Sequence, residues 1–480
     1  MNAGPSAPAA RAEPRPPWWP VWLYVLVAAT YLAFGYSVRI PFDAIHLIEH
    51  ELLATRPLES LWHWHAQPPL PNVVLAAAMA LARATGIATE SLLLPLQLAL
   101  GVVTVRSIAW LAYAVLRRKA AVFVAAATAC YPPLHEFVFV YYFVAFEIAC
   151  LAWLPGAAAA YALRPTAARF ASICAAAVVL TWSRSLFHPI FAVVVVVGIA
   201  WLRALPGGPA PRRRVAWTIA TLALLAAWPV KNLVQFGVAG YSSWQGAQLV
   251  RQLPVPVHPL LPLWYVPFVE PIDPRLQAAK ERADALVPAE LRDVPVVART
   301  HKASGAPNWN HFAMIDYGRE QQAAAVAAMW AHPAAVWAKV ERHYIGAFVR
   351  SPLRHPLDDS LLLLAVQHPV LVGFATFVER VTLGTLGPSR TPLFAYVFPV
   401  LFVAITITLV RRARRRHADP TWLPCVVAFA GLAWITGMAL LVDGEEANRM
   451  RLPTDAPFLA LVVWVVAPRV RAAASDHNSQ

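Results

Sequence analysis

Acidic and imidazole side chains cluster early in the chain. If the segment from Pro41 to Ala54 is a helix, at about 100° per residue, Asp43, His46 and His50 lie on one face. Apolar side chains then lie on the opposite face, as in an amphipathic helix at a membrane interface. One carboxylate beside two imidazoles suits a general base. The alternative interpretation is an ordinary solvated helix face.

Two further histidines follow in the run His63-Trp64-His65-Ala66-Gln67-Pro68-Pro69. The spacing of His63 and His65 suits a metal ion bound from an extended loop, although no acidic or cysteine ligand stands at motif spacing. The tryptophans around them are typical of an aromatic belt at the membrane surface, and the sequence favours that interpretation. No cofactor is identified with certainty, and a divalent cation is left open.

Two glutamates lie at or inside apolar segments. Glu136 stands in a short turn that begins at Tyr131, and Glu147 stands within the next apolar segment. An ionisable side chain is costly inside a membrane and is often functional there. Arg106, within another apolar segment, is the expected partner of Glu147. A structural ion pair and a functional site fit Glu147 equally well.

Cations and polar side chains stand at the ends of several apolar segments. They are Arg184, His188, Lys231, Asn232, Trp244 and Gln245, with Glu445, Arg449 and Arg451 in the loop before the last apolar segment. Any one of them could anchor a helix by snorkelling to the surface. As a group, their four cations stand at the depth of a lipid phosphate, which arginine binds in a bidentate manner. The sequence therefore predicts a phosphate-binding set.

Long apolar stretches must position these residues. Hydrophobic residues make up 59% of the 480 positions and charged residues 14%, against about a quarter charged in soluble domains. The net charge of +14 would suggest nucleic acid in a soluble protein. Here the arginines stand in short loops between apolar stretches, as the positive-inside rule describes. Composition thus indicates an all-α integral membrane protein with no nucleic-acid partner.

Ten apolar segments are expected to cross the membrane. They are 19–38, 91–116, 119–134, 141–163, 168–186, 188–204, 215–234, 392–410, 421–441 and 455–468. The stretch 69–85 is expected to be an interfacial helix, because counting it as a span moves later arginine-rich loops to the outside. This choice places both termini in the cytoplasm and the protein in the cytoplasmic (inner) membrane.

The predicted organisation follows from these spans. It comprises a disordered cytoplasmic tail (1–18), an N-terminal membrane module (19–236) with an interfacial loop (39–90), an outside-facing and mostly helical soluble segment (237–391), C-terminal transmembrane helices (392–470) and a second cytoplasmic tail (471–480).

This layout resembles the C-type (GT-C) superfamily of polytopic membrane glycosyltransferases. Asp43 matches the acidic residue that follows the first span in that superfamily, and Glu136 matches a second acidic residue at the next outside turn. The run from His65 to Leu70 matches the opening of an amphipathic helix. The loop from Glu445 to Arg451 matches an acidic-then-arginine loop before the final spans.

Two shorter fragments are similar to those of bacterial members, namely Ser242 to Gly246 and Asn308 to His311. The chain also departs from the pattern. Its first acidic residue, Asp43, is single, whereas a pair of aspartates is common in several branches. No diagnostic acceptor motif is visible, which leaves the acceptor and any use of metal open.

The resemblance implies sugar transfer from a polyprenyl-phosphate donor to a glycan or lipid acceptor at the outer membrane face. It points to the bacterial branch with mannosyltransferase-like and aminoarabinose-transferase-like enzymes. In such an enzyme Asp43 would accept the acceptor's proton, with Glu136 as second catalytic residue, and His46, His50, His65, Gln67 and the predicted phosphate-binding set would hold substrate. A lipid-linked glycan ligase or polymerase shares this architecture. A transporter or flippase would instead place polar groups near the midplane and often shows inverted repeats.

Overall fold

The computed structural model describes residues 15–44, 46–201, 210–250, 285–349, 377, 393–414, 422–441 and 451–467. Within these ranges the regular structure is helical, and the β pairing consists of two isolated bridges, Arg39–Val140 and His301–Pro307. The prediction of an all-α chain is confirmed for this part of the protein.

Several helices are long and apolar enough to cross a membrane. Five in the described chain meet this condition: α5 (Thr89–Val115), α8 (Phe143–Leu163), α11 (Pro211–Phe236), α19 (Leu393–Ala413) and α20 (Trp422–Leu441). A sixth span results if α6 (Arg118–Ala129) and α7 (Pro132–Val138), which are bent by 41° at their junction, form one crossing. The described chain is therefore that of a polytopic membrane protein.

The other predicted spans are shorter helices, so the structure does not show ten crossings. They are α1 (Trp19–Ala33), α9 (Ala167–Ser183), α10 (Pro189–Trp201) and α22 (Asp455–Val466), each below the ~20 residues that a helix needs to span about 30 Å. Local chemistry explains where α1 and α6 end. Gly35 follows α1 with a φ of 85°, and Pro132 and Pro133 end the straight path of α6, because proline cannot continue a helix without a kink.

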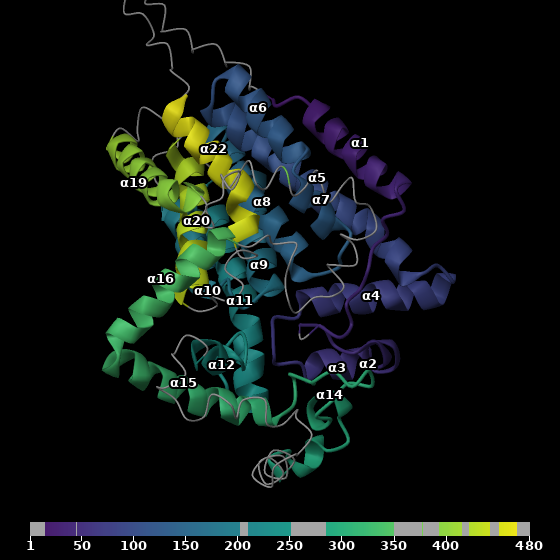
Figure 1. Ribbon diagram of the computed structural model, residues 1–480. Helices are drawn as coiled ribbons and strands as arrows, with labels where there is room; N and C mark the ends of the chain where they lie inside the picture. Colours follow the sequence, from purple (N-terminus) through teal and green to yellow (C-terminus); the bar gives the residue numbers. More distant parts are fainter. Residues whose placement is uncertain are drawn as a thin grey trace, which may run out of the picture.

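Helix α8 forms the centre of the bundle. Nearly all of its residues are buried, and it packs against α5, α9 and α20 (Figure 1). By contrast, α11 and α19 expose apolar side chains along much of their length, including Val215, Ile219, Val400 and Val403. Such surfaces are stable when the surrounding solvent is lipid, since water would make them costly. The bundle thus has an enclosed centre and lipid-facing outer helices.

The loop after α1 contains three short or medium helices, α2 (His50–Thr55), α3 (Pro57–Trp62) and α4 (Leu70–Thr85). In Figure 1, α4 lies crosswise to the long vertical helix α11. It buries Leu75, Ala76 and Met79 and exposes Val73 and Leu81. The segment 69–85 is therefore a helix, and its position at the membrane interface stays a prediction. A single helix from Pro41 to Ala54 is wrong, because only its last residues, from His50 on, are helical.

The described parts of the segment 237–391 contain helices joined by irregular chain. They form α12 (Gln245–Val250), a short 3₁₀ helix (η3, Ala289–Leu291), α14 (Pro295–Ala298), α15 (Ala313–Ala331) and α16 (Pro333–Val349). In Figure 1 α12, α14 and the start of α15 lie at the same end of the bundle as α2 and α3. We call this the loop end, formed by residues 39–49, 63–69, 240–246 and 294–311.

Candidate functional site

Backbone pairing joins the two segments that carry the predicted catalytic residues. The N–H of Arg39 donates to Phe139 O (2.9 Å), and the N–H of Tyr141 donates to Arg39 O (2.8 Å). Asp43 follows this pairing on one strand of chain, and the half-buried Glu136 precedes it on the other. Because this pairing is parallel, the two acidic residues lie on opposite sides of it: Asp43 belongs to the loop end, whereas the charge of Glu136 acts on Tyr31 and Tyr36.

Lys302 holds the loop that carries Asp43. Its Nζ donates to Phe42 O and Ala44 O, each at 2.8 Å, and to Leu47 O at 3.0 Å. An ammonium group has three N–H donors, so these three carbonyls use all of them. Three carbonyls that converge on one ammonium group do not run parallel to one another, as the carbonyls of a helix do. This contact is the physical reason why the residues before His50 do not form the predicted helix.

Glu49 and its neighbours tie the same loop to the segment that carries Lys302. The Glu49 carboxylate accepts from Ala303 N (3.0 Å) and pairs with Arg299, Oε1 to Nη1 3.5 Å. Burial lowers the pKa of Lys302 to about 8, against the opposing charges of Asp43 and Glu49. Sequence reasoning missed Lys302, since a lone lysine some 255 to 260 positions from its partners carries no local signal.

The predicted common face of Asp43, His46 and His50 is wrong. Asp43 and His50 are exposed, whereas His46 is 7% exposed and lies among aromatic rings. Its ring centroid is 4.7 Å from that of Phe143 and 5.5 Å from that of Trp244. The turn fixed by Lys302 sends these side chains in different directions, so a single base with two imidazoles is not assembled. Asp43 and His50 keep the accessibility that a base needs, whereas His46 does not.

Asn310 organises the predicted histidine-containing loop. It is fully buried, and its Oδ1 accepts from His65 N (2.7 Å) and Ala66 N (2.9 Å). Its Nδ2 donates to His63 O (3.0 Å) and Val296 O (3.1 Å). One side chain thus satisfies four backbone groups. The fragment 308–311, singled out in the sequence, therefore has a structural role in supporting this loop.

His65 is enclosed rather than open to a ligand. It is 2% exposed, and its Nδ1 lies 2.9 Å from Ser243 Oγ. Burial lowers the pKa of His65 well below its ordinary value, and the charge of Lys231 adds to the effect. The ring is therefore neutral near pH 7. His63 lies with Nδ1 3.0 Å from Glu59 O, and among the described residues no three His, Cys, Asp or Glu side chains gather as metal ligands.

The buried Glu147 pairs with Arg184, not with Arg106. Arg184 Nη1 lies 3.4 Å from Glu147 Oε1, and its guanidinium is 4.3 Å from the ring centroid of Phe143. Gln67 joins the same region, since its Oε1 accepts from Ser185 Oγ at 2.8 Å. The residues 67, 147 and 184 therefore come together at the loop end.

The expected partnership of Arg106 with Glu147 is wrong because the two residues belong to different ends of their helices. Glu147 stands in the first turns of α8. Arg106 stands in the second half of α5, where its Nη1 donates to Pro16 O (2.7 Å) and Pro17 O (3.1 Å). Its guanidinium also lies 4.3 Å from the ring centroid of Trp18. Arg106 thus anchors the N-terminal segment.

Lys231 and Asn232 lie near the loop-end terminus of α11. The Lys231 ammonium donates to Trp64 O (2.5 Å) and to Asn232 Oδ1 (3.3 Å), and it lies 4.4 Å from the ring centroid of Trp228. Asn232 is buried and donates to Gly240 O (2.9 Å). Lys231 is half-buried, so its charge stands close to the site without being exposed.

The remaining predicted site residues have mixed positions. Trp244 is buried and donates to Trp309 O (2.8 Å), and Gln245 begins α12. His188 Nδ1 accepts from Ile190 N (3.3 Å) in the turn before α10. Glu445 and Arg449 lie outside the described residues.

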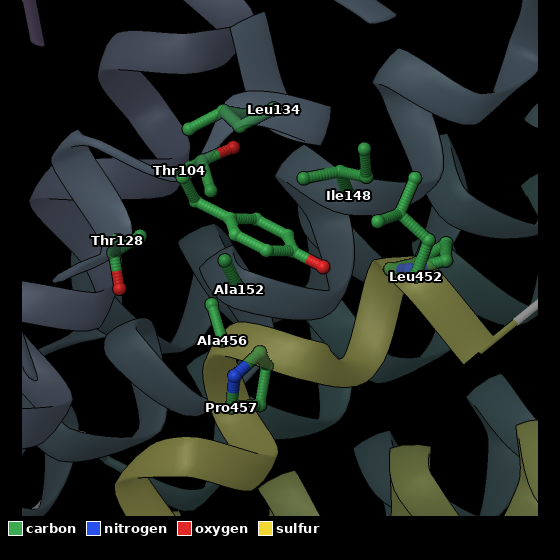
Figure 2. Close-up of a pocket in the computed structure, with 10 residues that line it drawn as sticks. Thr104, Thr128, Leu134, Ile148, Ala152, Leu452, Ala456 and Pro457 are labelled. Atoms are coloured by element: carbon green, nitrogen blue, oxygen red, sulfur yellow. The ribbon is translucent and has the colours of Figure 1, made fainter. Parts of the chain in front are cut away.

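Arg451, Asp455 and Tyr131 form a chain of polar contacts separate from the loop end. Its Nε lies 3.3 Å from Asp455 Oδ1, and Asp455 Oδ2 accepts from Tyr131 Oη at 2.6 Å. A small pocket lies beside Tyr131, lined mainly by apolar side chains such as Leu134, Ile148 and Leu452 (Figure 2). It has room for about one water molecule, so it is too small for a sugar or a lipid.

Comparisons with known proteins leave the family open. No model of a known protein family matches the chain, and no curated protein matches it in sequence. Among solved structures it is similar to the archaeal oligosaccharyltransferase AglB from Archaeoglobus fulgidus, solved in complex with an inhibitory peptide and a dolichol-phosphate. The identity is 12% and the TM-score 0.38, over 93% of this chain and 50% of that chain. The chain thus spans about half the length of that protein.

Proposed function

We propose that this chain is a membrane glycosyltransferase that moves a sugar from a polyprenyl-phosphate donor to a glycan or lipid acceptor at the loop end. One observation carries the proposal. The exposed carboxylate of Asp43 stands on a loop whose carbonyls are held by the buried Lys302, at the end of an apolar helix bundle. A general base must be both accessible and held in place. A lipid-linked substrate would bring its reactive end to this depth of the membrane.

Lys231 is the cation best suited to the donor's phosphate. Arg184 already has the charge of Glu147 beside it, and Arg451 has that of Asp455. The Lys231 ammonium contacts two neutral oxygens, those of Trp64 and Asn232. These two contacts bring no counter-charge to the ammonium and leave a third N–H donor for a phosphate oxygen. Charge held next to a leaving phosphate stabilises the transition state as the glycosidic bond breaks.

The positions of the ionisable residues favour an enzyme over a transporter. Glu147 is near the start of α8, Arg184 follows α9, and Lys231 is near the end of α11. Transporters bind their substrates near the bilayer midplane, whereas these three residues stand at helix ends. A lipid-linked glycan ligase or polymerase remains the alternative, and it differs in transferring a chain of sugars rather than one sugar.

Transfer assays test the proposal directly. The purified protein in lipid nanodiscs is supplied with polyprenyl-phosphate mannose or polyprenyl-phosphate aminoarabinose, radiolabelled in the sugar, and with a bacterial envelope glycan and glycolipid extract as acceptor. The released polyprenyl phosphate and the label bound to the acceptor are measured. Asp43→Asn should reduce release by about 10²-fold or more, the typical contribution of a general base. Asp293→Asn, which changes another exposed aspartate directly before the loop-end residues 294–311, should leave release unchanged. Undiminished release by Asp43→Asn removes its assignment as the base, and no release from either donor by the wild-type protein contradicts the proposed donors.

A further inference from the structure

Three arginines line one cavity at the end of the bundle away from the loop end. The cavity has a volume of about 500 Å³ and is lined by Arg15, Pro17, Trp19, Tyr113, Leu116, Arg117, Arg118 and Val122. We call it the arginine cavity. None of these lining residues is acidic. Its volume lies within the range of about 300–1,000 Å³ that is usual for small-ligand sites.

Arg106 fixes one wall of the arginine cavity. It holds the carbonyls of Pro16 and Pro17 and stacks against Trp18, so the chain beside Arg15 is tied to α5. This tether spans about 90 positions of sequence. Arg15 is therefore placed at the cavity by a long-range contact with α5 and not only by its neighbours in the chain.

The tight junction between α5 and α6 places the other two arginines. Helix α5 ends at Val115 and α6 begins at Arg118, while the intervening Leu116 is 2% exposed and anchors the turn. Arg117 and Arg118 are exposed, and within the described chain no carboxylate pairs with either of them or with Arg15. The first turn of α6 also contains no acidic residue, so the partial positive charge of the helix start adds to that of the arginines.

Three arginines without a paired carboxylate among the described residues suit an anion, and the surroundings of the cavity indicate which kind. Guanidinium groups bind phosphate oxygens in a bidentate manner. Apolar side chains that can contact acyl chains lie next to the cavity: Val122 and Phe123 on α6 and Trp22 on α1 are all exposed. In Figure 1, α1 and α6 both lie at the end of the bundle opposite α2 and α3. We propose that the arginine cavity binds the headgroup phosphate of an anionic phospholipid.

This proposal does not depend on sugar transfer. The arginines also belong to the loops that the positive-inside rule places on the cytoplasmic side, where anionic lipids bind basic pockets between helices. A bound lipid would fasten the N-terminal segment to the junction of α5 and α6, since Arg15 comes from the former and Arg117 and Arg118 from the latter.

The test measures lipid binding to the whole protein in a neutral detergent. Phosphatidylglycerol is titrated in, and bound lipid is counted by native mass spectrometry, with phosphatidylcholine and inorganic phosphate in parallel. The Arg117→Gln/Arg118→Gln variant should lose at least about tenfold in phosphatidylglycerol affinity, given roughly a factor of five per arginine. Arg15→Gln should lose less. The matched control, Arg212→Gln/Arg213→Gln, removes two exposed arginines at the start of α11 and should retain wild-type affinity.

Each of three other outcomes would contradict the proposal. Equal losses in the control variant would mean that net charge, not the cavity, attracts the lipid. Equal binding of phosphatidylcholine would remove the requirement for an anion. Displacement of the lipid by an equal concentration of inorganic phosphate would identify a site for free phosphate. The Arg117→Lys/Arg118→Lys variant keeps the charge and guards against misfolding, and it should bind phosphatidylglycerol more tightly than the glutamine variant.

Discussion

Arg184 and Glu147 form an ion pair, Nη1 to Oε1 3.4 Å, in which the two side chains are only 6% and 1% exposed. Arg184 is the residue after α9, and Glu147 lies in the first turns of α8. The pair therefore fastens the loop-end termini of two central helices. Because desolvation of both charges opposes their attraction, its net contribution is smaller than its geometry suggests.

Removing one member of this pair should be more damaging than removing both. Arg184→Met leaves the Glu147 carboxylate buried without its arginine, and we expect a loss of about 3–5 kcal/mol in stability. Arg184→Met/Glu147→Met should recover most of that loss. Unfolding of the detergent-solubilised protein, followed by tryptophan fluorescence, measures the difference.

The exposed pair Arg56–Glu59, at 3.3 Å with side chains 52% and 37% exposed, provides the control for the buried pair. Arg56→Met should cost less than about 1 kcal/mol. If the effects of Arg184→Met and Glu147→Met simply add in the double variant, the two charges do not depend on each other.

Lys302 should make stability depend on pH above neutrality. Its pKa is about 8 in the folded chain, because burial disfavours the charged form, and about 10.4 in an unfolded chain. Between these values the unfolded state binds more protons, so the free energy of unfolding rises with pH. The cost is fully present below about pH 8 and is relieved toward pH 10. Wild-type protein should therefore gain stability relative to Lys302→Met from pH 8 to pH 10, by at most about 1.4 kcal/mol per pH unit.

Unfolding curves at several pH values, measured for wild type, Lys302→Met and Lys119→Met, test this dependence. Lys119 is exposed, so its replacement should leave the wild-type pH dependence intact. A wild-type curve parallel to that of Lys302→Met between pH 8 and pH 10 would contradict a lowered pKa for this lysine. The same Lys302→Met variant should also show faster amide exchange in residues 42–47 at fixed pH, because three carbonyls lose their common donor.

Features that neighbouring residues determine can be predicted from the sequence, whereas features that distant residues determine cannot. The apolar segments and a helix over 69–85 follow from local composition, whereas the predicted span 119–134 runs past the end of α6 at Ala129, because it overlooked Pro132 and Pro133. The segment from Pro41 to Ala54 shows where such reasoning fails. Its polar residues have helical spacing, yet Lys302, far away in sequence, donates hydrogen bonds to its carbonyls. A contact over so many residues outweighs local helix propensity, and it cannot be recognised from a single sequence.

The same limit applies to the candidate site. The sequence singles out Asp43, Arg184 and Lys231 by residue type, and the structure places all three at the loop end. Their partners were not predictable by type. Glu147 lies inside an apolar stretch with two candidate arginines, and only the direction of the helices decides between Arg106 and Arg184.

Asn310 should be required for the order of the loop at 63–69. Asn310→Ala leaves three backbone groups without this partner, the buried N–H groups of His65 and Ala66 and the carbonyl of His63, while Val296 O keeps the bond from Asn308 Nδ2. We expect a loss of several kcal/mol, at about 1–3 for each unsatisfied buried group. Asn310→Asp keeps the acceptor but loses both donors, and should also destabilise. Gln322→Ala, at an exposed position of α15, is the control, and a Tm equal to that of wild type in Asn310→Ala would contradict this role.

The crossing of α12 and α15 depends on two glycines. A Cβ on Gly318 would overlap the carbonyl oxygen of Ser243, and one on Gly246 would overlap the carbonyl oxygen of Gly318. Backbone cannot move aside as a flexible side chain can, so Gly318→Ala should force the helices apart and cost about 1–3 kcal/mol or more. A Cβ on Gly437 of α20 would meet no atom of the described residues within 4 Å, and Gly437→Ala should be neutral or stabilising by up to about 1 kcal/mol.

Because the residues before α12 include Ser243, which contacts His65, Gly318→Ala should also speed amide exchange in residues 63–69. Loss of stability without that local change would mean that α12 and α15 are not coupled to the loop end.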